Sequence, residues 1–312
     1  MRRYISVDEV CVELLGDGVT EIAESFTSSF SRRYLPDPRL ADYCSTVDIE
    51  VSWIRGTGFR VLATGYYDVL PDKYVVEGAP VEPYVNEAPV FFLIQALARR
   101  LALRDRFILT DSVSIHIPRT GRAVLLLGYP HTGKSTISSI AYSKGFTVLS
   151  TENTVVEASG SGLRVRAGSS ILVFDPRVKE LYGVNVSPHY TTRHGYGVLD
   201  IGDEKRASLL RDGVEASSIY ILHTSFSSSG VSVEQVKGRK IGKLLWYFAV
   251  SVLKGLDFYE PVPLNMPLES LENRLLGFLS TIREKYEGRV FEVFGSPLEV
   301  FTEIARREGG SL

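Results

Sequence analysis

The sequence predicts a mixed α/β protein in which a strand-rich domain, residues 107–312, follows a smaller N-terminal α+β domain, residues 1–106. A chain of 312 residues has the length of two ordinary domains. Its composition, 44% apolar and 23% charged, is that of a folded chain with a packed core. Near Phe107 the pattern changes to short apolar runs separated by turns, which places the boundary there.

The first domain is expected to contain three strands and two helices. Alternating apolar residues predict the strands Val10–Leu15, Val47–Trp53 and Phe59–Thr64, and helical periodicity predicts Thr20–Phe30. A second helix, Ala88–Leu103, is apolar on most of its circumference and is therefore expected to be buried between layers. No chemical motif occurs here, so we expect either a role in substrate specificity or oligomer contacts, or a purely structural cap.

The second domain is expected to be a succession of short strands and a few helices. The predicted strands are Val113–Ile117, Arg122–Leu127, Thr147–Leu149, Val155–Ala158, Leu163–Arg166, Ser170–Phe174 and Ser218–His223. The predicted helices are Ser135–Ser143, Gly242–Leu253, Leu268–Tyr286 and Leu298–Arg306. Gly145 is placed to end the first of these helices, and Ser296-Pro297 to begin the last.

The charge balance restricts the partners. Thirty-five basic and 37 acidic residues give a net charge of −2, so no overall cationic field exists to hold a nucleic acid or an anionic membrane. No apolar run reaches the roughly 18 residues that cross a bilayer, and no apolar segment follows the basic N-terminus. We therefore expect a cytoplasmic protein that binds a small molecule and can form a homo-oligomer.

The cysteines and the amide side chains give weaker indications. Two cysteines, Cys11 and Cys44, are too few for a disulfide framework and lack the spacing of a zinc site, so we expect two buried thiols in a reducing cytosol. The chain has only two glutamines and two methionines, and arginine outnumbers lysine. Such a composition favours a heat-adapted, thermophile source.

The strongest motif is a phosphate-binding P-loop at residues 128–136. It reads Gly-Tyr-Pro-His-Thr-Gly-Lys-Ser-Thr and lies between a predicted strand and a predicted helix, as such loops require. Its glycines allow the backbone amides to curl around phosphate, at the positive end of the helix. The residues expected to bind the nucleotide are Gly128, Pro130, His131, Thr132, Gly133, Lys134, Ser135 and Thr136.

Within this loop, three side chains have distinct expected roles. Lys134 would reach the β- and γ-phosphates of ATP, and the Ser135 hydroxyl would coordinate Mg²⁺. His131 could donate to a phosphate oxygen or could serve only as a spacer. Pro130 would stiffen the loop and so lower the entropic cost of binding.

Two common classes of P-loop protein are disfavoured. A GTPase would carry Asn-Lys-x-Asp, which does not occur in this sequence. A motor-type ATPase would show an apolar strand ending in aspartate, whereas Ile219–Leu222 ends in His223-Thr224. The order found instead is P-loop, helix, Gly145, a short strand, and then Thr151-Glu152.

That order resembles the C-terminal catalytic domain of the HPr kinase/phosphorylase family, which is related to phosphoenolpyruvate carboxykinase, over roughly Ser112–Leu312. In that family an acidic pair follows the P-loop helix, and one acid acts as base on the acceptor hydroxyl. Glu152 falls on the second acid, whereas Thr151 replaces the first. The resemblance therefore implies a P-loop kinase of HPr kinase type, with Glu152 and Lys134 as catalytic residues and ATP and Mg²⁺ as cofactors.

A second family motif is matched in part. Glu180-Leu181-Tyr182-Gly183 is similar to the signature Glu-Ile-Arg-Gly, whose glutamate binds the metal. The resemblance thus implies Glu180 as a metal ligand beside Ser135. The family's histidine upstream of the P-loop is not matched at its usual offset; the nearest polar side chains are Asp111, Ser112 and His116. These departures leave a reverse phosphorolysis activity open.

Two loops could hold the acceptor. Residues 187–196 contain Arg193 and His194 in a segment too polar for a core, and we expect these two side chains, with His116, to contact the substrate. Residues 224–230, followed by the cationic 237–240, are suited to closing over phosphates.

The acceptor itself is expected to be the hydroxyl of a small metabolite, by analogy with the serine that the family phosphorylates. Free L-threonine or L-serine is the first candidate, with Arg193 binding the carboxylate and Glu152 or Asp200 the ammonium group. Two alternatives stay open: a protein-serine kinase of HPr kinase type, and a non-catalytic ATP-binding regulatory protein. The donor could also be ADP, GTP or pyrophosphate.

Overall fold

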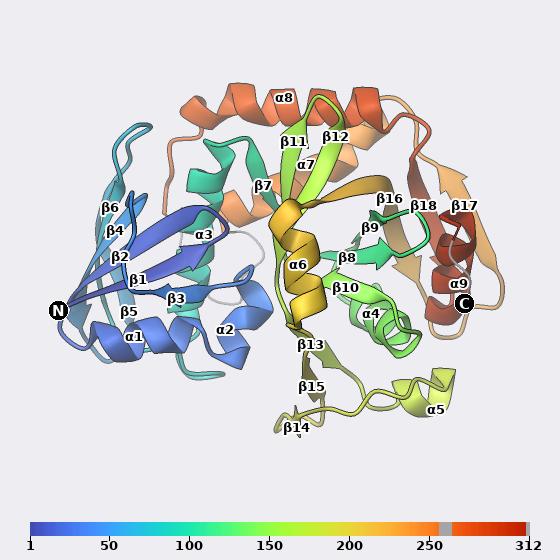
Figure 1. Cartoon of the computed structure of the whole chain (residues 1–312), viewed down its shortest axis with the longest axis horizontal. Helices are drawn as coiled ribbons and strands as arrows, with labels where there is room; N and C mark the ends of the chain where they lie inside the picture. Colours follow the sequence, from blue (N-terminus) through green and yellow to red (C-terminus); the bar gives the residue numbers. More distant parts are fainter. Residues whose placement is uncertain (256–263, 310–312) are drawn as a thin grey trace.

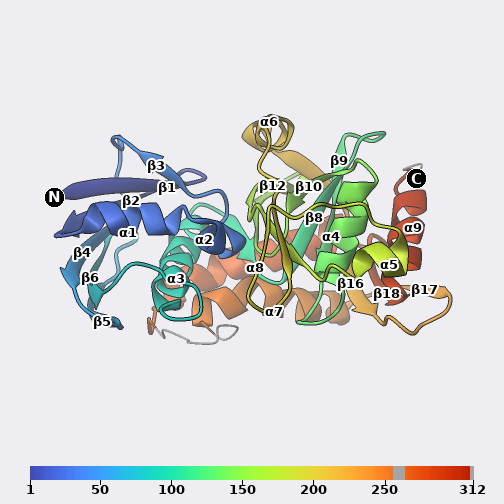
Figure 2. The same ribbon diagram turned by 90° about the horizontal axis from the view of Figure 1, so that it is seen from below.

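The computed structural model of the protein describes residues 1–255 and 264–309 (Figure 1). Three sheets and nine helices make up the described residues, which confirms the prediction of a mixed, strand-rich α/β fold. The sheet formed by residues 2–78 lies at one end of the molecule, and the last helix lies at the other (Figures 1 and 2).

The N-terminal sheet has six strands. Their order is β3 (Arg39–Ala41), β1 (Arg2–Val7), β2 (Val10–Gly16), β4 (Ile49–Arg55), β6 (Asp72–Gly78) and β5 (Phe59–Gly65). The strands β2, β4 and β6 run parallel, and the others pair antiparallel. Helix α1 (Val19–Phe26) packs on β1 and β2 through its buried face.

The predicted helix Thr20–Phe30 is in fact two helices. The chain leaves the α-helical conformation after α1, and α2 (Ser29–Tyr34) begins after Ser28. The Ser28 hydroxyl accepts a hydrogen bond from the Ser31 amide at 3.3 Å, which caps the new helix. The break was missed because Ile22, Ala23, Phe26 and Phe30 follow helical spacing across it, although α2 buries only Ser31.

The two cysteines form a disulfide bond, so the expectation of two buried thiols is wrong. Cys11 lies in β2, and Cys44 lies in the segment between β3 and β4, with a Cα–Cα distance of 6.3 Å. The bond ties the sheet to a connection 33 residues farther along the chain. Spacing in the sequence could not indicate it, because the pair is brought together only by the sheet.

Helix α3 (Ala88–Ala102) joins the N-terminal sheet to the rest of the protein. Every residue of the helix is buried, as predicted. It packs against β7 (Arg106–Leu109), α7 (Arg239–Lys254) and α8 (Glu269–Lys285). Its one fully buried cation, Arg99, pairs with Asp72 at the start of β6, at 2.7 Å. A continuous apolar core therefore runs through α3 from one sheet to the next.

The second sheet contains nine strands. The main path is β10 (Thr147–Ser150), β8 (Ser112–Ile117), β9 (Arg122–Leu127), β16 (Val214–Thr224), β12 (Gly162–Gly168), β11 (Thr154–Ser159) and β7. β18 (Val290–Gly295) runs parallel to β16, and β17 (Val231–Gln235) pairs with β18. β9 also runs parallel to β16, so the ends of β9 and β16 reach the same edge of the sheet.

Helices cover both faces of this sheet. Leu125 and Ile219 contribute to the core shared with α7 and α8, whereas Val124, Leu126 and Tyr220 face α4 (Lys134–Ser143) and α9 (Pro297–Arg307). Because both faces are buried, β9 and β16 are nearly continuous apolar runs. The predicted central strand Ser218–His223 is confirmed as part of β16.

A small third sheet lies below the second one in Figure 1. It consists of β13 (Ile171–Phe174), β15 (Gly197–Asp200) and β14 (Tyr190–Thr191), and the short helix α5 (Val178–Tyr182) follows β13. Helix α6 (Glu204–Asp212) was not predicted, because it buries only Arg206 and Leu210 and therefore has no apolar stripe. In the described ranges, no helix combines the length and the apolar character needed to cross a membrane.

The disulfide should stabilise the protein by constraining the unfolded chain. Replacing Cys44 with serine should lower the free energy of unfolding by roughly 3–4 kcal/mol, the loop-entropy value for this separation. Urea unfolding with and without reductant measures the effect, and the exposed neighbour Ser45→Ala is the control. Reductant should destabilise the wild type but not Cys44→Ser. An unfolding midpoint that reductant leaves unchanged in the wild type would contradict the bond.

Candidate functional site

The predicted phosphate loop connects the end of β9 to the start of α4. Gly133 has a φ of 81° and His131 a φ of 67°, both in the left-handed region. Such left-handed residues next to right-handed ones turn successive amides toward a common centre, the arrangement that binds anions. Two residues of the loop, Gly133 and the non-glycine His131, therefore have the left-handed conformation that such anion-binding turns use.

Both glycines of the loop lie where a side chain would not fit. A Cβ atom on Gly128 would be 2.2 Å from the Thr132 hydroxyl oxygen, and one on Gly133 would be 2.3 Å from the Thr224 hydroxyl oxygen. The Thr224 hydroxyl also donates a hydrogen bond to the Thr132 carbonyl at 2.6 Å. The end of β16 thus holds the loop that follows its neighbour β9.

Side chains of the loop divide into exposed and buried sets. Pro130 and His131 are exposed at its tip, Thr132 and Ser135 are half-buried, and Thr136 is buried. The Tyr129 ring packs against the Tyr247 and Phe248 rings of α7, with centroid distances of 4.8 and 5.5 Å. Aromatic contacts therefore fix one side of the loop to a helix.

Lys134 is buried, and its ammonium group is bound to the protein itself. Its Nζ donates to the carboxylate of Asp111 at 2.7 Å and to the carbonyl oxygens of Gly128 and Tyr129 at 2.5 and 3.1 Å. These three acceptors match the three protons of an ammonium group. To reach a phosphate, the lysine must exchange at least one of these partners for a phosphate oxygen.

Asp111 has a place at the site that the sequence did not predict, beyond its being one of the polar residues upstream of the P-loop. It lies between β7 and β8 with a φ of 50°, and its carbonyl accepts from the Gly128 amide at 3.1 Å. The carboxylate is buried beside Lys134. The signal in the sequence was an aspartate between two short apolar strands just ahead of the P-loop strand, a place where a charge needs a buried partner.

Glu152 is linked by its backbone to Ser112, the residue after Asp111. Its carbonyl accepts from the Ser112 amide at 2.8 Å, and its amide donates to the Ser169 hydroxyl at 2.8 Å. The preceding Thr151 points elsewhere, because its buried hydroxyl donates to the Ile171 carbonyl at 2.9 Å. The threonine that stands at the expected first acid is thus part of the sheet packing, and Glu152 is half-buried beside Asp111-Ser112.

Helix α2 of the N-terminal unit ends against the same residues. The Asn153 amide side chain donates to the Tyr34 carbonyl at 2.8 Å, which fixes the end of the helix. Burial raises the pKa of the Tyr34 hydroxyl to about 12, with Arg33 opposing and Glu152 adding to the shift. The negative charge of Glu152 therefore helps to raise the pKa of Tyr34, the last residue of α2.

Arg33 brings a positive charge into this region. Its guanidinium carbon lies 5.1 Å from the centre of the Tyr34 ring. Burial lowers the pKa of Arg33, but Tyr34, Glu152, Tyr84 and Glu87 together outweigh burial and raise it. Among the described residues, no carboxylate comes within 4 Å of this guanidinium, so it is near acids without being paired to one.

The loop of residues 187–196 reaches the same unit. The Arg193 guanidinium carbon stacks 4.2 Å from the centre of the Tyr84 ring, and the His194 ring meets Tyr84 edge-on at 5.3 Å. The Tyr84 amide in turn donates to the Glu87 carboxylate at 2.8 Å. Arg193 and His194 therefore lie beside Tyr84, which with Glu87 also helps to raise the pKa of Arg33.

Two other predicted substrate contacts are placed differently. The Asp200 carboxylate accepts hydrogen bonds from both terminal nitrogens of Arg32, at 2.6 and 2.8 Å, so it already forms an ion pair. His116 pairs with Ala123 and Thr147, at the end of β8 opposite Ser112, so it is not part of the cluster around Glu152. Burial, and then Lys205, lowers its pKa.

Glu180 is exposed on the short helix α5. The helix approaches residues 224–230 through Tyr182, whose ring centre is 6.4 Å from that of Phe226. Within the part of the chain that the structure describes, no three histidine, cysteine or acidic side chains form a metal-binding group. A P-loop magnesium ion needs few protein ligands, because phosphates and water supply most of its coordination. Ser135 at the start of α4 fits that requirement.

The cationic segment 237–240 is partly engaged. Lys240 forms an ion pair with Glu292 of β18, and that carboxylate also faces His223. Burial raises the pKa of Glu292, but Lys240 and then His223 outweigh burial and lower it. The end of this segment is therefore bound to the sheet.

No protein-family model matches the chain, and no curated protein matches it. The family resemblance seen in the motifs stays an expectation. A function for the site must therefore be argued from the residues around the loop.

The buried Lys134–Asp111 pair should be energetically coupled. Lys134→Met and Asp111→Asn should each lower the free energy of unfolding by about 3–5 kcal/mol, because each leaves the other charge buried without this partner. The double variant should be less destabilised than the sum of the two. Chemical unfolding of the four proteins measures the cycle. Strict additivity would contradict the pairing.

Proposed function

We propose that the protein is an ATP-dependent kinase that transfers the γ-phosphoryl group to a hydroxyl of a small molecule. The proposal rests on the loop 128–135, whose backbone depends on Gly128 and Gly133 and which lies at the edge of the sheet. The half-buried Glu152 lies close by, because its carbonyl accepts a hydrogen bond from the Ser112 amide. Phosphoryl transfer needs little more than positioned phosphates and a carboxylate that takes the hydroxyl proton.

In this proposal the residues of the chain have separate tasks. The amides of residues 131–135 and the ammonium group of Lys134, released from Asp111, hold the β- and γ-phosphates. The acceptor oxygen forms the new bond to the γ-phosphorus, the bond from that phosphorus to the bridging oxygen breaks, and ADP leaves. Glu152 takes the hydroxyl proton. Ser135 would hold Mg²⁺, which when bound neutralises charge on the phosphate oxygens.

The charges beside Glu152 favour a zwitterionic acceptor. Arg33 and Arg193 supply two cations, and Glu152 and Glu87 supply two carboxylates, in one neighbourhood. Such a balance suits a free amino acid, whose carboxylate would bind a guanidinium and whose ammonium would bind an acid. L-threonine and L-serine add the hydroxyl, so they are the proposed acceptors. Glu87 takes the place that the sequence gave to Asp200.

We also assign residues 107–312 to a P-loop kinase fold of HPr kinase type. The support is the order of P-loop, α4, Gly145 with a φ of 82°, β10 and Glu152. We place the activity in the cytoplasm. The disulfide fits that compartment only for a heat-adapted source, where intracellular disulfides do occur.

One observation favours a second candidate, a non-catalytic ATP-binding regulator. The Thr151 hydroxyl, which stands where the family has its first acid, is bonded to the Ile171 carbonyl. A protein that binds ATP without transferring phosphate needs no acid at that position. Turnover separates the two candidates.

The decisive experiment incubates the protein with labelled ATP, Mg²⁺ and a panel of hydroxylated metabolites and protein extracts. Phosphothreonine or phosphoserine is the expected product. Glu152→Gln should lower kcat at least 100-fold with ATP affinity nearly unchanged, because a general base contributes about 10²–10⁴-fold. Lys134→Ala should lose most activity, and the exposed Glu204→Gln is the matched control.

Three outcomes of that experiment oppose the proposal. A tight ATP complex without turnover for any acceptor would support the regulator. Label found only in protein would support a protein-serine kinase. Wild-type rates in Lys134→Ala would remove the phosphate loop from the mechanism.

The cations should act on the acceptor and not on ATP. Arg33→Ala and Arg193→Ala should each raise the acceptor KM by about 10-fold or more, the usual size of a lost charge-assisted hydrogen bond. The Kd for ATP should stay within about twofold. Steady-state kinetics measure both, and the exposed Arg39→Ala on β3 is the control. An unchanged acceptor KM in both variants would rule out this acceptor pocket.

A further inference from the structure

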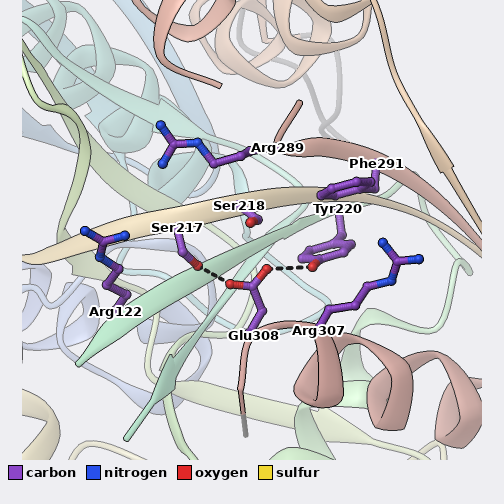
Figure 3. Close-up of a pocket in the computed structure, with 8 residues that line it drawn as sticks. All are labelled: Arg122, Ser217, Ser218, Tyr220, Arg289, Phe291, Arg307 and Glu308. Carbon is purple, nitrogen blue, oxygen red and sulfur yellow. Dashed lines mark hydrogen bonds between the residues drawn. The ribbon is translucent and has the colours of Figure 1, made fainter. Parts of the chain in front are cut away.

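A pocket of about 370 Å³ lies beside the middle of β16, where β9 and β18 begin (Figure 3). Its floor is polar and buried, and Ser217, Ser218 and Tyr220 of β16 form it. Phe291, Arg289 and the end of α9 complete the lining. None of the residues lining this pocket belongs to the proposed kinase site.

Glu308 stands at the centre of the pocket and is held by two hydroxyls. Its carboxylate accepts from Ser217 and from Tyr220, each at 2.6 Å (Figure 3). Burial, and then this carboxylate, raises the pKa of Tyr220, so the tyrosine stays a donor at any physiological pH. The side chain is therefore oriented and is not a loose surface acid.

Three guanidinium groups surround the pocket without closing on Glu308. Arg122, Arg289 and Arg307 stand around the carboxylate in Figure 3, yet among the described residues none of them comes within 4 Å of it. Three cations and one carboxylate leave a formal excess of two positive charges in the lining.

The arginines also keep unused donors. Among the described residues, the Arg122 guanidinium has only a long ion pair with Glu215, at 3.7 Å. Arg289 donates one nitrogen to the Lys285 carbonyl and lies over the Tyr286 ring at 5.2 Å. Arg307 donates its Nε to Glu303 at 2.7 Å, which leaves its terminal nitrogens. A guanidinium carries five N–H donors, so each of the three retains several.

We propose that this pocket binds a phosphate monoester of a small hydroxylated molecule, at a site separate from the phosphate loop. Guanidinium groups bind phosphate through paired N–H donors, and a dianion matches the charge excess. The oriented Glu308 would accept from a hydroxyl of the ligand, and the Ser218 hydroxyl lines the same floor.

The register of the strands separates this site from the loop. Arg122 begins β9, whereas Gly128 follows its last residue, six residues away. At about 3.3 Å per strand residue, a phosphate held by Arg122 would lie roughly 20 Å from Gly128, too far to reach the loop, although the pocket also extends to Tyr220, which pairs with Leu126 nearer the loop. The inference is thus independent of the kinase proposal.

Calorimetric titration with glycerol 3-phosphate tests the proposal, with inorganic phosphate and glycerol as reference probes. It is done in Lys134→Ala, so that the phosphate loop contributes little. One site should remain in that variant, and adding Arg122→Ala or Arg289→Ala should weaken it about 10-fold, the value of one lost charged contact. Adding the exposed Arg55→Ala should change nothing.

A measurement on the wild type guards against misfolding of these variants. Glycerol 3-phosphate should protect Arg122, Arg289 and Arg307 from phenylglyoxal, as read by peptide mass spectrometry, and should leave Arg55 unprotected. The proposal is overturned if the three arginines are modified at the same rate with and without the probe. It is also overturned if arginine removal leaves the affinity unchanged, or if inorganic phosphate binds as tightly as the ester.

Discussion

The candidate site depends on the parallel pairing of β9 and β16, because both strands end at the same edge of the sheet. β9 leads into the phosphate loop, and Thr224 at the end of β16 holds that loop by its hydroxyl. The loop is fastened on its other side by Lys134 and Asp111. A phosphate-binding loop held at both sides loses little entropy when a ligand arrives, and such preorganisation favours binding.

In the proposed kinase, the N-terminal unit would be more than a cap. The buried helix α3 joins its core to that of the second sheet, so α2 and the loop around Tyr84 are set against Glu152 and Arg193. Arg33 and the Tyr34 and Tyr84 rings, which come from the N-terminal unit, belong to a segment with no recognisable motif. In this account, one unit supplies the phosphate loop and the other supplies much of the acceptor's surroundings.

The sequence predicted most elements correctly, because strong apolar periodicity is a local signal; the phosphate loop, read from a local glycine-lysine motif, stays a prediction. The sequence missed the break at Ser28, where a single serine caps a new short helix. It also missed the bond of Cys11 to Cys44, and the parts played by Asp111 and Arg33, because tertiary contacts across the fold create them. The candidate base Glu152 was named from a family resemblance and from the expectation that its strand neighbours the P-loop strand β9, but that strand, β10, pairs with β8 instead.

The most direct measurement of the central claim is an experimental structure with a non-hydrolysable ATP analogue and Mg²⁺. The account predicts phosphate oxygens within hydrogen-bonding distance of the amides of residues 131–135. It also predicts Lys134 drawn from Asp111 toward the β- and γ-phosphates, with the Glu152 carboxylate facing the terminal phosphate. A nucleotide bound elsewhere, or a Glu152 carboxylate turned away from that phosphate, would contradict it.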